Sequence, residues 1–246
     1  MHVAEGVEAL ELTMAFMGGH TTIHPTLVWD ESDVILIDAG MPGSLDAIRE
    51  GARRAGAPFE RLNRVILTHQ DIDHIGGLPE LLRAAGHDVE VLAHEADRPY
   101  IEGEKQPIKL NREFMAERAK DLPAEQRARV AAILDDPPRA RVTRALRGGE
   151  ELPYCGGIRV FHTPGHTPGH ISLYLNRTKT LVTGDALVSE NGVLQGPRPG
   201  ATPDMDSAVA SLAKLTGLDI DAAVTYHGGV VTGDVGERLA ELAGAG

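Results

Sequence analysis

The stretch Arg64-Val-Ile-Leu-Thr-His-Gln-Asp-Ile-Asp-His-Ile-Gly-Gly77 carries the strongest signal in the sequence. Its apolar beginning predicts a buried strand, and the strand runs directly into potential metal ligands: His69, Asp71, Asp73 and His74. In α/β proteins, strand ends carry functional groups because the rigid sheet holds the loops. Four such groups crowded together would repel one another or stay unsatisfied without a cation. We therefore expect a metal site here; the alternative is a polar turn that happens to be rich in His and Asp.

Strands and helices alternate on both sides of this stretch. Before it, we expect strands at 10–17, 26–30 and 34–38, a hairpin turn at 30–33 and a helix that begins at Ser44. After it, a helix at 78–85 and a strand at 89–93 follow. The second half predicts strands at 158–161, 171–175, 180–183 and 222–225, a Gly/Pro-rich loop at 187–203, and helices at 204–215 and from 234. This order is typical of an α/β fold, here with two halves that face each other.

Three further motifs follow apolar strands. They are Thr163-Pro-Gly-His-Thr-Pro-Gly-His170, Thr183-Gly-Asp185 and Tyr226-His227-Gly-Gly. Each alone is weak, because a Gly-Asp or His-Gly turn is usually only a turn. Together they could converge with the first stretch on one site, with His170 supporting a ligand or the loop.

Residues 102–147 differ from the rest in charge. They hold 11 basic and 8 acidic residues, whereas the whole chain has a net charge of −12. We expect two or three helices, broken at Pro123 and at Pro137-Pro138. This segment, called the insertion below, is either a solvated helical insertion or a cap whose Arg and Lys select an anionic substrate.

Composition narrows the classes of function. The 246 residues fit a single domain over 1–246, and the acidic balance disfavours nucleic acid and anionic membranes as partners. With one Cys and 11 His, a metal site must use His and carboxylates. We expect Cys155 to be a buried apolar residue and not a nucleophile. The chain has no signal-like start and no apolar run long enough to span a bilayer, so we expect a cytoplasmic protein.

The order of these motifs resembles the metallo-β-lactamase fold hydrolases, including glyoxalase II-like and lactonase-like members. The resemblance runs from Ile37-Asp-Ala-Gly40 to His227-Gly. It implies a four-layer αββα sandwich with the helical insertion added. The family signature is His-x-His-x-Asp-His, then a Thr-Pro-Gly-His loop, a Gly-Asp and a late His-Gly.

The resemblance implies a ligand set for two divalent ions, with zinc expected. His69, Asp71 and His166 would bind the first ion, and the others would bind or bridge to the second: Asp73, His74, His227 and the bridging Asp185. Asp73 would also act catalytically by taking a proton from the attacking water. His170 would support the ligands.

Asp71 stands where the family usually has its second His. A carboxylate is harder than imidazole, so it favours Mn²⁺ or Fe²⁺ more than His does. Three possibilities follow: Asp71 ligates directly, ligates through water, or leaves the first site weak or empty. Diiron flavoproteins related to this fold also carry a carboxylate at the corresponding place.

Two divalent ions about 3.5–4 Å apart can share a hydroxide, which is a nucleophile at neutral pH. We therefore expect a hydrolase of an ester, lactone, thioester or related bond in a small-molecule substrate, which the basic insertion suggests is anionic. The alternative is a non-haem iron oxidoreductase, either persulfide dioxygenase-like or diiron. The sequence does not resolve the oligomeric state; dimers are common in this family, and a homodimer is possible by that analogy alone.

Overall fold

The computed structural model describes residues 1–16 and 19–244. Two mixed β-sheets form its centre, and two short hairpins accompany them. The first sheet has seven strands in the order β1 (His2–Ala4), β2 (Val7–Ala9), β5 (Thr26–Trp29), β6 (Val34–Ile37), β7 (Arg64–Leu67), β8 (Glu90–His94) and β9 (Arg144–Leu146). The second has six in the order β10 (Glu151–Leu152), β11 (Ile158–His162), β12 (Ile171–Leu175), β13 (Thr180–Val182), β16 (Ala222–Thr225) and β17 (Gly229–Thr232).

Strand direction places the carboxyl ends of several strands together. Strands β6 to β9 run parallel, and β13 runs parallel to β16 in the second sheet. The hairpins are β3 (Leu12–Phe16) with β4 (Gly19–Ile23), and β14 (Val188–Glu190) with β15 (Val193–Gln195). Parallel strands aligned in this way bring the loops at their carboxyl ends to one edge of the sheet.

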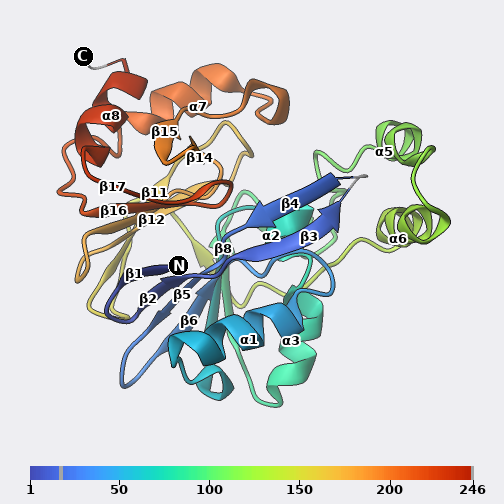
Figure 1. Ribbon diagram of the computed structural model, residues 1–246, viewed down its shortest axis with the longest axis horizontal. Coiled ribbons are helices and arrows are strands. Elements are labelled where there is room, and N and C mark those ends of the chain that lie inside the picture. The colour runs from blue at the N-terminus through green and yellow to red at the C-terminus, as the bar shows by residue number, and fades with distance from the viewer. Residues whose placement is uncertain (17–18, 245–246) are drawn as a thin grey trace.

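The described residues form eight α-helices, several of which cover the outer faces of the two sheets. They are α1 (Leu45–Ala55), α2 (Ile72–Ile75), α3 (Leu78–Ala85), α4 (Arg98–Ile101), α5 (Arg112–Ala119), α6 (Ala124–Asp135), α7 (Met205–Leu212) and α8 (Val235–Leu242), with single 3₁₀ turns at Phe59–Arg61 and Pro199–Ala201. Figure 1 shows α1 and α3 against the first sheet and α7 and α8 against the second. Within the described residues, no helix combines the length and the apolar composition that crossing a bilayer requires.

The apolar side chains form three layers that match this arrangement. Alternation along β6 sends Ile35 and Ile37 into the core between the sheets, while Val34 and Leu36 pack with the cluster under α1 and α3. A third cluster joins the second sheet to α7 and α8 through residues such as Leu212. The four layers are therefore helix, sheet, sheet and helix, and the predicted αββα sandwich is confirmed.

Three of the predicted segments differ clearly from the structure, and short strands such as β1 and β2 were not predicted. The segment 187–203 was expected to be a loop, but it contains the hairpin β14–β15. The strand expected at 10–17 begins at Leu12, and residue 17 lies outside the described residues. The expected helix at 204–215 ends at Leu212, although Asp204 caps it as predicted by accepting a hydrogen bond from the Ser207 N–H.

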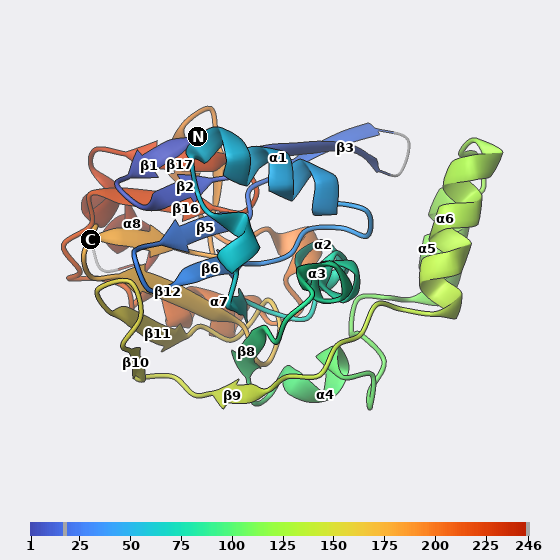
Figure 2. The same cartoon turned by 90° about the horizontal axis from the view of Figure 1, so that it is seen from below.

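The insertion contains two helices and the last strand of the first sheet. Helices α5 and α6 lie on either side of Pro123 and pack on each other through a small cluster that includes Leu122 and Val130. Figure 2 shows this pair standing apart from the sandwich. After Pro137-Pro138 the chain returns and forms β9, so the end of the insertion belongs to the sheet.

Candidate metal centre

The predicted ligands come together at one edge of the two sheets. Each follows the end of a strand: His69 follows β7, His166 follows β11, Asp185 follows β13 and His227 follows β16. The turn after β7 leads directly into α2. The His74 N–H donates a hydrogen bond to the Asp71 carbonyl at 2.9 Å, at the start of this helix. The rings of His69 and His74 therefore lie 3.9 Å apart.

The first group consists of His69, Asp71 and His166. The Oδ2 atom of Asp71 lies 3.3 Å from His69 Nε2 and 3.0 Å from His166 Nε2. All three side chains are buried or nearly so. One ligand atom from each lies within 4.8 Å of the others, which suits a single cation.

The second group consists of Asp73, His74 and His227. Asp73 Oδ2 lies 3.2 Å from His227 Nε2 and 3.8 Å from His74 Nε2. Asp185 lies between the two groups: its Oδ1 is 3.4 Å from His74 Nε2, and its Oδ2 is 3.2 Å from His166 Nε2 and 3.5 Å from His227 Nε2. The structure therefore brings all seven predicted ligands together, with Asp185 where a bridging ligand would lie.

The carboxylates of the site are held in their ionised form. Burial alone would raise the pKa of Asp71, but His69, His166 and the Lys109 ammonium outweigh it and hold that pKa well below its usual value. Burial also acts to raise the pKa of Asp185, and the imidazoles of His227, His74 and His166 again lower it well below its usual value. The pKa of Asp73 is lowered for the same reason, by His74 and His227 against burial. All three carboxylates are therefore ionised, which is the form in which a carboxylate binds a cation.

Three buried atoms of the site have no hydrogen-bond partner among the described residues. They are His69 Nε2, His74 Nε2 and Asp185 Oδ1. An unpaired buried polar atom costs about 1–3 kcal/mol, so native structures rarely keep three in one place. A pair of divalent ions would satisfy all three, and the donor set of four imidazoles and three carboxylates suits such ions. The side chains of the site are therefore suited to bind two divalent metal ions.

Asp38 and Thr68 orient two of the imidazoles. Asp38 has a φ of 63°, and its carboxylate accepts hydrogen bonds from the Thr68 N–H at 2.8 Å and the Thr68 hydroxyl at 2.8 Å. It also accepts from Nδ1–H of His74 at 2.9 Å, and Thr68 Oγ1 lies 3.0 Å from His69 Nδ1. These bonds leave the Nε2 lone pairs of both imidazoles facing the site.

Asp97 joins the two loops that carry the first group. Its buried carboxylate accepts from the Gln70 N–H at 3.0 Å and from the Gln70 side-chain amide at 3.1 Å. It also accepts from the Thr167 hydroxyl and the Gly169 N–H, both at 2.7 Å. The positions of His69 and His166 therefore depend on one carboxylate that is not a ligand.

His170 supports Asp185, as expected, and belongs to none of the metal-type groups of the described residues. Its Nε2 accepts from the Asp185 N–H at 2.9 Å, and its Nδ1 lies 2.8 Å from Thr163 Oγ1. Burial lowers the pKa of His170 well below its usual value, and neighbouring imidazoles lower it further, so the ring stays neutral. Gly184 permits this contact, because a Cβ there would lie 2.6 Å from His170 Nε2 and its φ is 53°.

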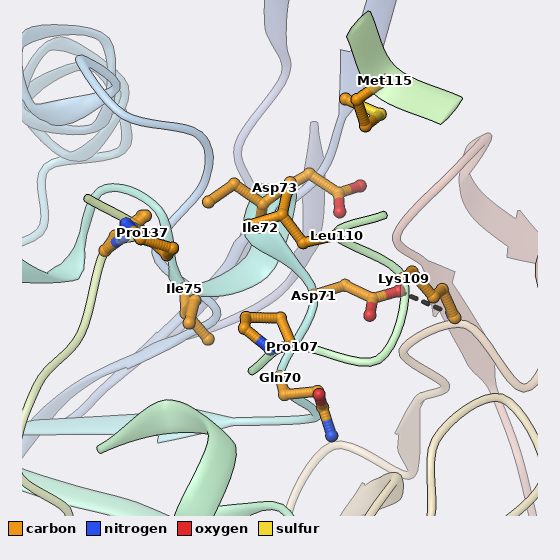
Figure 3. A pocket seen from close by; sticks show the side chains of 11 residues that line it. Gln70, Asp71, Ile72, Asp73, Ile75, Pro107, Lys109, Leu110, Met115 and Pro137 are labelled. Atoms are coloured by element: carbon orange, nitrogen blue, oxygen red, sulfur yellow. Dashed lines mark hydrogen bonds and ion pairs between the residues drawn. The ribbon is translucent and has the colours of Figure 1, made fainter. Parts of the chain in front are cut away.

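A small cavity opens beside the ligands (Figure 3). Its volume is about 140 Å³ and it begins at Asp71 and Asp73. Its remaining lining is mainly apolar: Ile72, Ile75, Pro107, Leu110, Met115, Pro137 and Pro138, with Gln70 and Lys109. Most of the far wall therefore comes from the insertion.

No role was predicted for Asp38, Asp97, Lys109 or Tyr226, although Asp38 and Tyr226 lie in sequence segments described above. Asp38 follows a buried strand as the ligands do, and that signal could have indicated it. Tyr226 stacks on His74 with ring centres 3.7 Å apart, and its hydroxyl donates to the Asp73 carbonyl. No local pattern marks Asp97 or Lys109, which act through tertiary contacts.

The other histidines lie outside these groups. His24 contacts the Tyr226 carbonyl at 3.1 Å, and His87 contacts the Leu62 carbonyl at 2.8 Å. His94 and His162 stack on each other with ring centres 4.0 Å apart. These histidines therefore contact main-chain carbonyls or each other and have structural roles.

Known proteins are similar to this chain in sequence and in fold. The metallo-beta-lactamase superfamily model matches residues 18–227. The chain is 34% identical over 227 residues to the probable metallo-hydrolase YflN of Bacillus subtilis (strain 168), which covers 85% of this chain and 81% of the relative. It is similar to the crystal structure of a metallo-beta-lactamase family protein from Thermus thermophilus, with a TM-score of 0.71 and 25% identity over 99% of this chain and 80% of that one.

A more distant relative is the atrochrysone carboxyl ACP thioesterase of Claviceps purpurea (strain 20.1). It is 24% identical over 182 residues, which cover 74% of this chain and 43% of the relative. Together, the sandwich fold, the clustered His and Asp side chains and these similarities show that the chain belongs to the metallo-β-lactamase superfamily and is a hydrolase of that fold.

Proposed function

We propose that this protein uses two divalent metal ions to hydrolyse an ester, thioester or lactone bond in a small molecule. The observation that carries the proposal is the convergence of seven ligand-type side chains, three of whose buried atoms have no hydrogen-bond partner among the described residues. His69, Asp71 and His166 would hold one ion, and Asp73, His74 and His227 the other, with Asp185 shared. When bound, such ions polarise a carbonyl and make water nucleophilic at neutral pH.

The residues of the chain supply orientation and a proton acceptor. Asp73 lines the cavity and its lowered pKa keeps it ionised, so its carboxylate can accept a proton from an attacking water. Asp38, through His74, and His170, through Asp185, hold the ligands in place. Cys155 is buried between the sheets, so a thiol nucleophile is not part of the proposal.

The cavity supports a substrate with an apolar group next to the cleaved carbonyl. A volume of about 140 Å³ resembles that of engineered apolar cavities, about 150 Å³, that bind benzene. A short acyl chain therefore fits better than a large polar group. The similarity to a protein named as a thioesterase supports an acyl substrate in the same way.

The charge of the insertion offers less support for an anionic substrate than its composition suggested. Four of its ion pairs lie on the exposed surface: Arg112–Asp135, Lys120–Glu117, Arg129–Glu125 and Arg139–Asp136. Acidic neighbours neutralise these basic side chains, and the four pairs lie away from the cavity. Lys109 is the basic residue that lines it, so any preference for an anion would depend on Lys109.

Asp71 also supports a second candidate, the non-haem iron oxidoreductase. A carboxylate in the first group makes that group harder than three imidazoles would be, which favours Fe²⁺ or Mn²⁺ over Zn²⁺ more than the usual set does. The two candidates differ in the metal retained on purification. If the purified protein contained redox-active iron, consumed oxygen and hydrolysed none of the substrates, the oxidoreductase would replace the hydrolase as the preferred function.

The test is a screen of short-chain and long-chain esters, thioesters, lactones, β-lactams and phosphodiesters, with bound metal measured on the same preparation. Asp185→Asn and His74→Ala should each lower kcat/KM by more than about 100-fold and reduce metal content, because changing even a residue that supports a ligand costs about 10- to 100-fold. Asp219→Asn and His87→Ala are matched controls: Asp219 is an exposed partner of Lys179, and His87 lies near the opposite end of β8. Full activity in either ligand variant contradicts the proposal.

A further inference from the structure

Lys109 of the insertion reaches into the first group of ligands. Its Nζ lies 2.6 Å from Asp71 Oδ2 and 2.5 Å from His166 Nε2. Figure 3 shows the contact with Asp71 at the edge of the cavity. The ammonium therefore contacts two of the three residues that would bind the first metal.

The backbone next to Lys109 is fixed to the ligand loop itself. The side-chain oxygen of the buried Gln70 accepts from the Ile108 N–H at 3.0 Å, and the same amide donates to Asp97 at 3.1 Å. Gln70 lies between His69 and Asp71 in the chain, so one side chain connects the ligand loop, Asp97 and the insertion. This network fixes the position of Lys109. The length of its side chain is therefore not the only reason that it reaches the site.

The second group has no such occupant. Among the contacts of the described residues, no Lys or Arg pairs with Asp73, His74, His227 or Asp185. The two groups thus share the bridging Asp185 but differ in whether a cation of the chain already contacts them.

We propose that the Lys109 ammonium competes with metal for the first group, so that the chain binds one divalent ion tightly at the second group and another more weakly at the first. An ammonium group only donates hydrogen bonds, and it uses the lone pairs of Asp71 and His166 that a metal would need. A metal and an ammonium at those atoms would also repel each other. Binding in the first group therefore requires Lys109 to leave.

This competition couples metal loading to the cavity wall. Pro107 and Leu110 flank Lys109 in the chain and line the cavity. Release of the Lys109 side chain would change the polar edge of the cavity, and by reciprocity any group that holds its ammonium away from the ligands would raise the affinity of the first group for metal. The inference concerns metal binding, so it can be tested without a substrate.

The experiment is a zinc titration of the chelated, full-length protein against a competing indicator. In the wild type, we expect one tight equivalent and a second weaker one. Lys109→Met keeps a long side chain but removes the charge. It should raise the affinity for the second equivalent of zinc by about 10- to 100-fold, which corresponds to the loss of one charge-assisted hydrogen bond. The affinity for the first equivalent should not change. Lys109→Arg keeps a cation and should retain the weak second equivalent.

Lys105→Met is the control, because Lys105 lies in the same segment and its Nζ is 5.3 Å from the ring of Tyr100, outside the site. It should behave as the wild type. Circular dichroism of each metal-free variant checks that it is folded. Equal affinity for both equivalents in the wild type, or an unchanged or weaker second equivalent in Lys109→Met, would overturn the proposal.

Discussion

Asp38 shows at the scale of one residue how the chain builds the site. A non-glycine residue with positive φ is uncommon, and Asp is one of the residues that tolerate it best. The turn directs the carboxylate to Thr68 and to Nδ1 of His74, both within 2.9 Å. Asp38 is therefore a positioning residue for a ligand 36 positions away in the chain.

Asp38→Asn should lower metal affinity by about 10- to 100-fold while the protein stays folded, because the ligand imidazole loses its charged acceptor. The measurement is metal competition with a chelator, together with circular dichroism. Asp88→Asn, at an exposed position between α3 and β8, is the control. Metal affinity equal to that of the wild type would show that His74 does not need this support.

Asp71 is the residue at which the chain departs from the family pattern. Asp71→His should still bind metal but shift preference towards Zn²⁺ relative to Mn²⁺, because imidazole is softer than carboxylate. Parallel titrations with the two ions measure the ratio of affinities. If Asp71→Ala keeps two tightly bound ions and the wild-type rate, Asp71 is not a ligand.

Cys155 provides a pH-dependent prediction away from the metals. Burial raises the pKa of its thiol to about 12, with Asp30 and Asp33 acting in the same direction. The folded state therefore favours the neutral thiol. This preference stabilises the folded protein below the pKa of the thiol in the unfolded chain, about 8.5, and the stabilisation is lost as the pH rises towards about 12. At pH 8 the folded protein should react negligibly with a disulfide reagent, and the same protein in denaturant should react within minutes. Rapid labelling of the folded protein would contradict the buried assignment.

At the scale of elements, the two ligand loops behave as one unit because Asp97 holds both. Asp97→Ala would leave the N–H groups of Gln70 and Gly169 and the Thr167 hydroxyl without their acceptor. At about 1–3 kcal/mol for each unsatisfied group, the free energy of unfolding should fall by roughly 3 kcal/mol or more. Urea unfolding of the metal-free protein measures this.

Asp219→Ala serves as the comparison for that measurement, because Asp219 is an exposed ion-pair partner of Lys179. An exposed pair contributes about 0–1 kcal/mol, so this variant should unfold close to the wild type. Equal effects of the two substitutions would show that Asp97 does not join the loops.

The elements that the sequence predicted well are those with long apolar runs. Strands such as Arg64–Leu67 and Ile171–Leu175 are buried along most of their length, and their hydrophobic pattern is plain. Strands of three residues, such as His2–Ala4 and Val188–Glu190, are too short to show a period and depend on pairing with partners. The hairpin in the expected loop at 187–203 was missed for this reason.

The candidate ligands were predictable because each follows a strand in a recognisable motif. Of their supporting residues, His170 was predicted, and Asp38 carried a signal that could have indicated it, but Asp97 and Lys109 carried none. Asp97 lies 27 positions from Gln70 and 70 from Thr167, and Lys109 lies 57 from His166, so only the folded chain brings them together. No local pattern carries information on such contacts.

At the scale of the whole molecule, both sheets contribute ligands to one site. The loop after β7 and the start of α2 supply four of them, and loops after three strands of the second sheet supply His166, Asp185 and His227. A bound metal would therefore join the two halves and relieve repulsion among the three carboxylates, in a chain whose net charge is −12.

Chelation should accordingly lower the melting temperature. A ligand that binds only the folded state, present at 100 times its Kd, stabilises that state by about 2.7 kcal/mol. Differential scanning calorimetry with and without added Zn²⁺ measures the shift, and Asp185→Asn should show a smaller one. Identical melting of the metal-loaded and chelated wild type would argue against a metal between the sheets.

The most direct test of the account is to measure hydrolysis and metal content together during removal and restoration of the metal. For whichever ester, thioester or lactone the screen identifies, we predict that activity disappears as chelation removes the metal and returns in proportion to divalent metal added back, while Asp185→Asn recovers neither tight binding nor rate. A metal-free protein that hydrolyses the same substrate at the full rate would contradict the central claim.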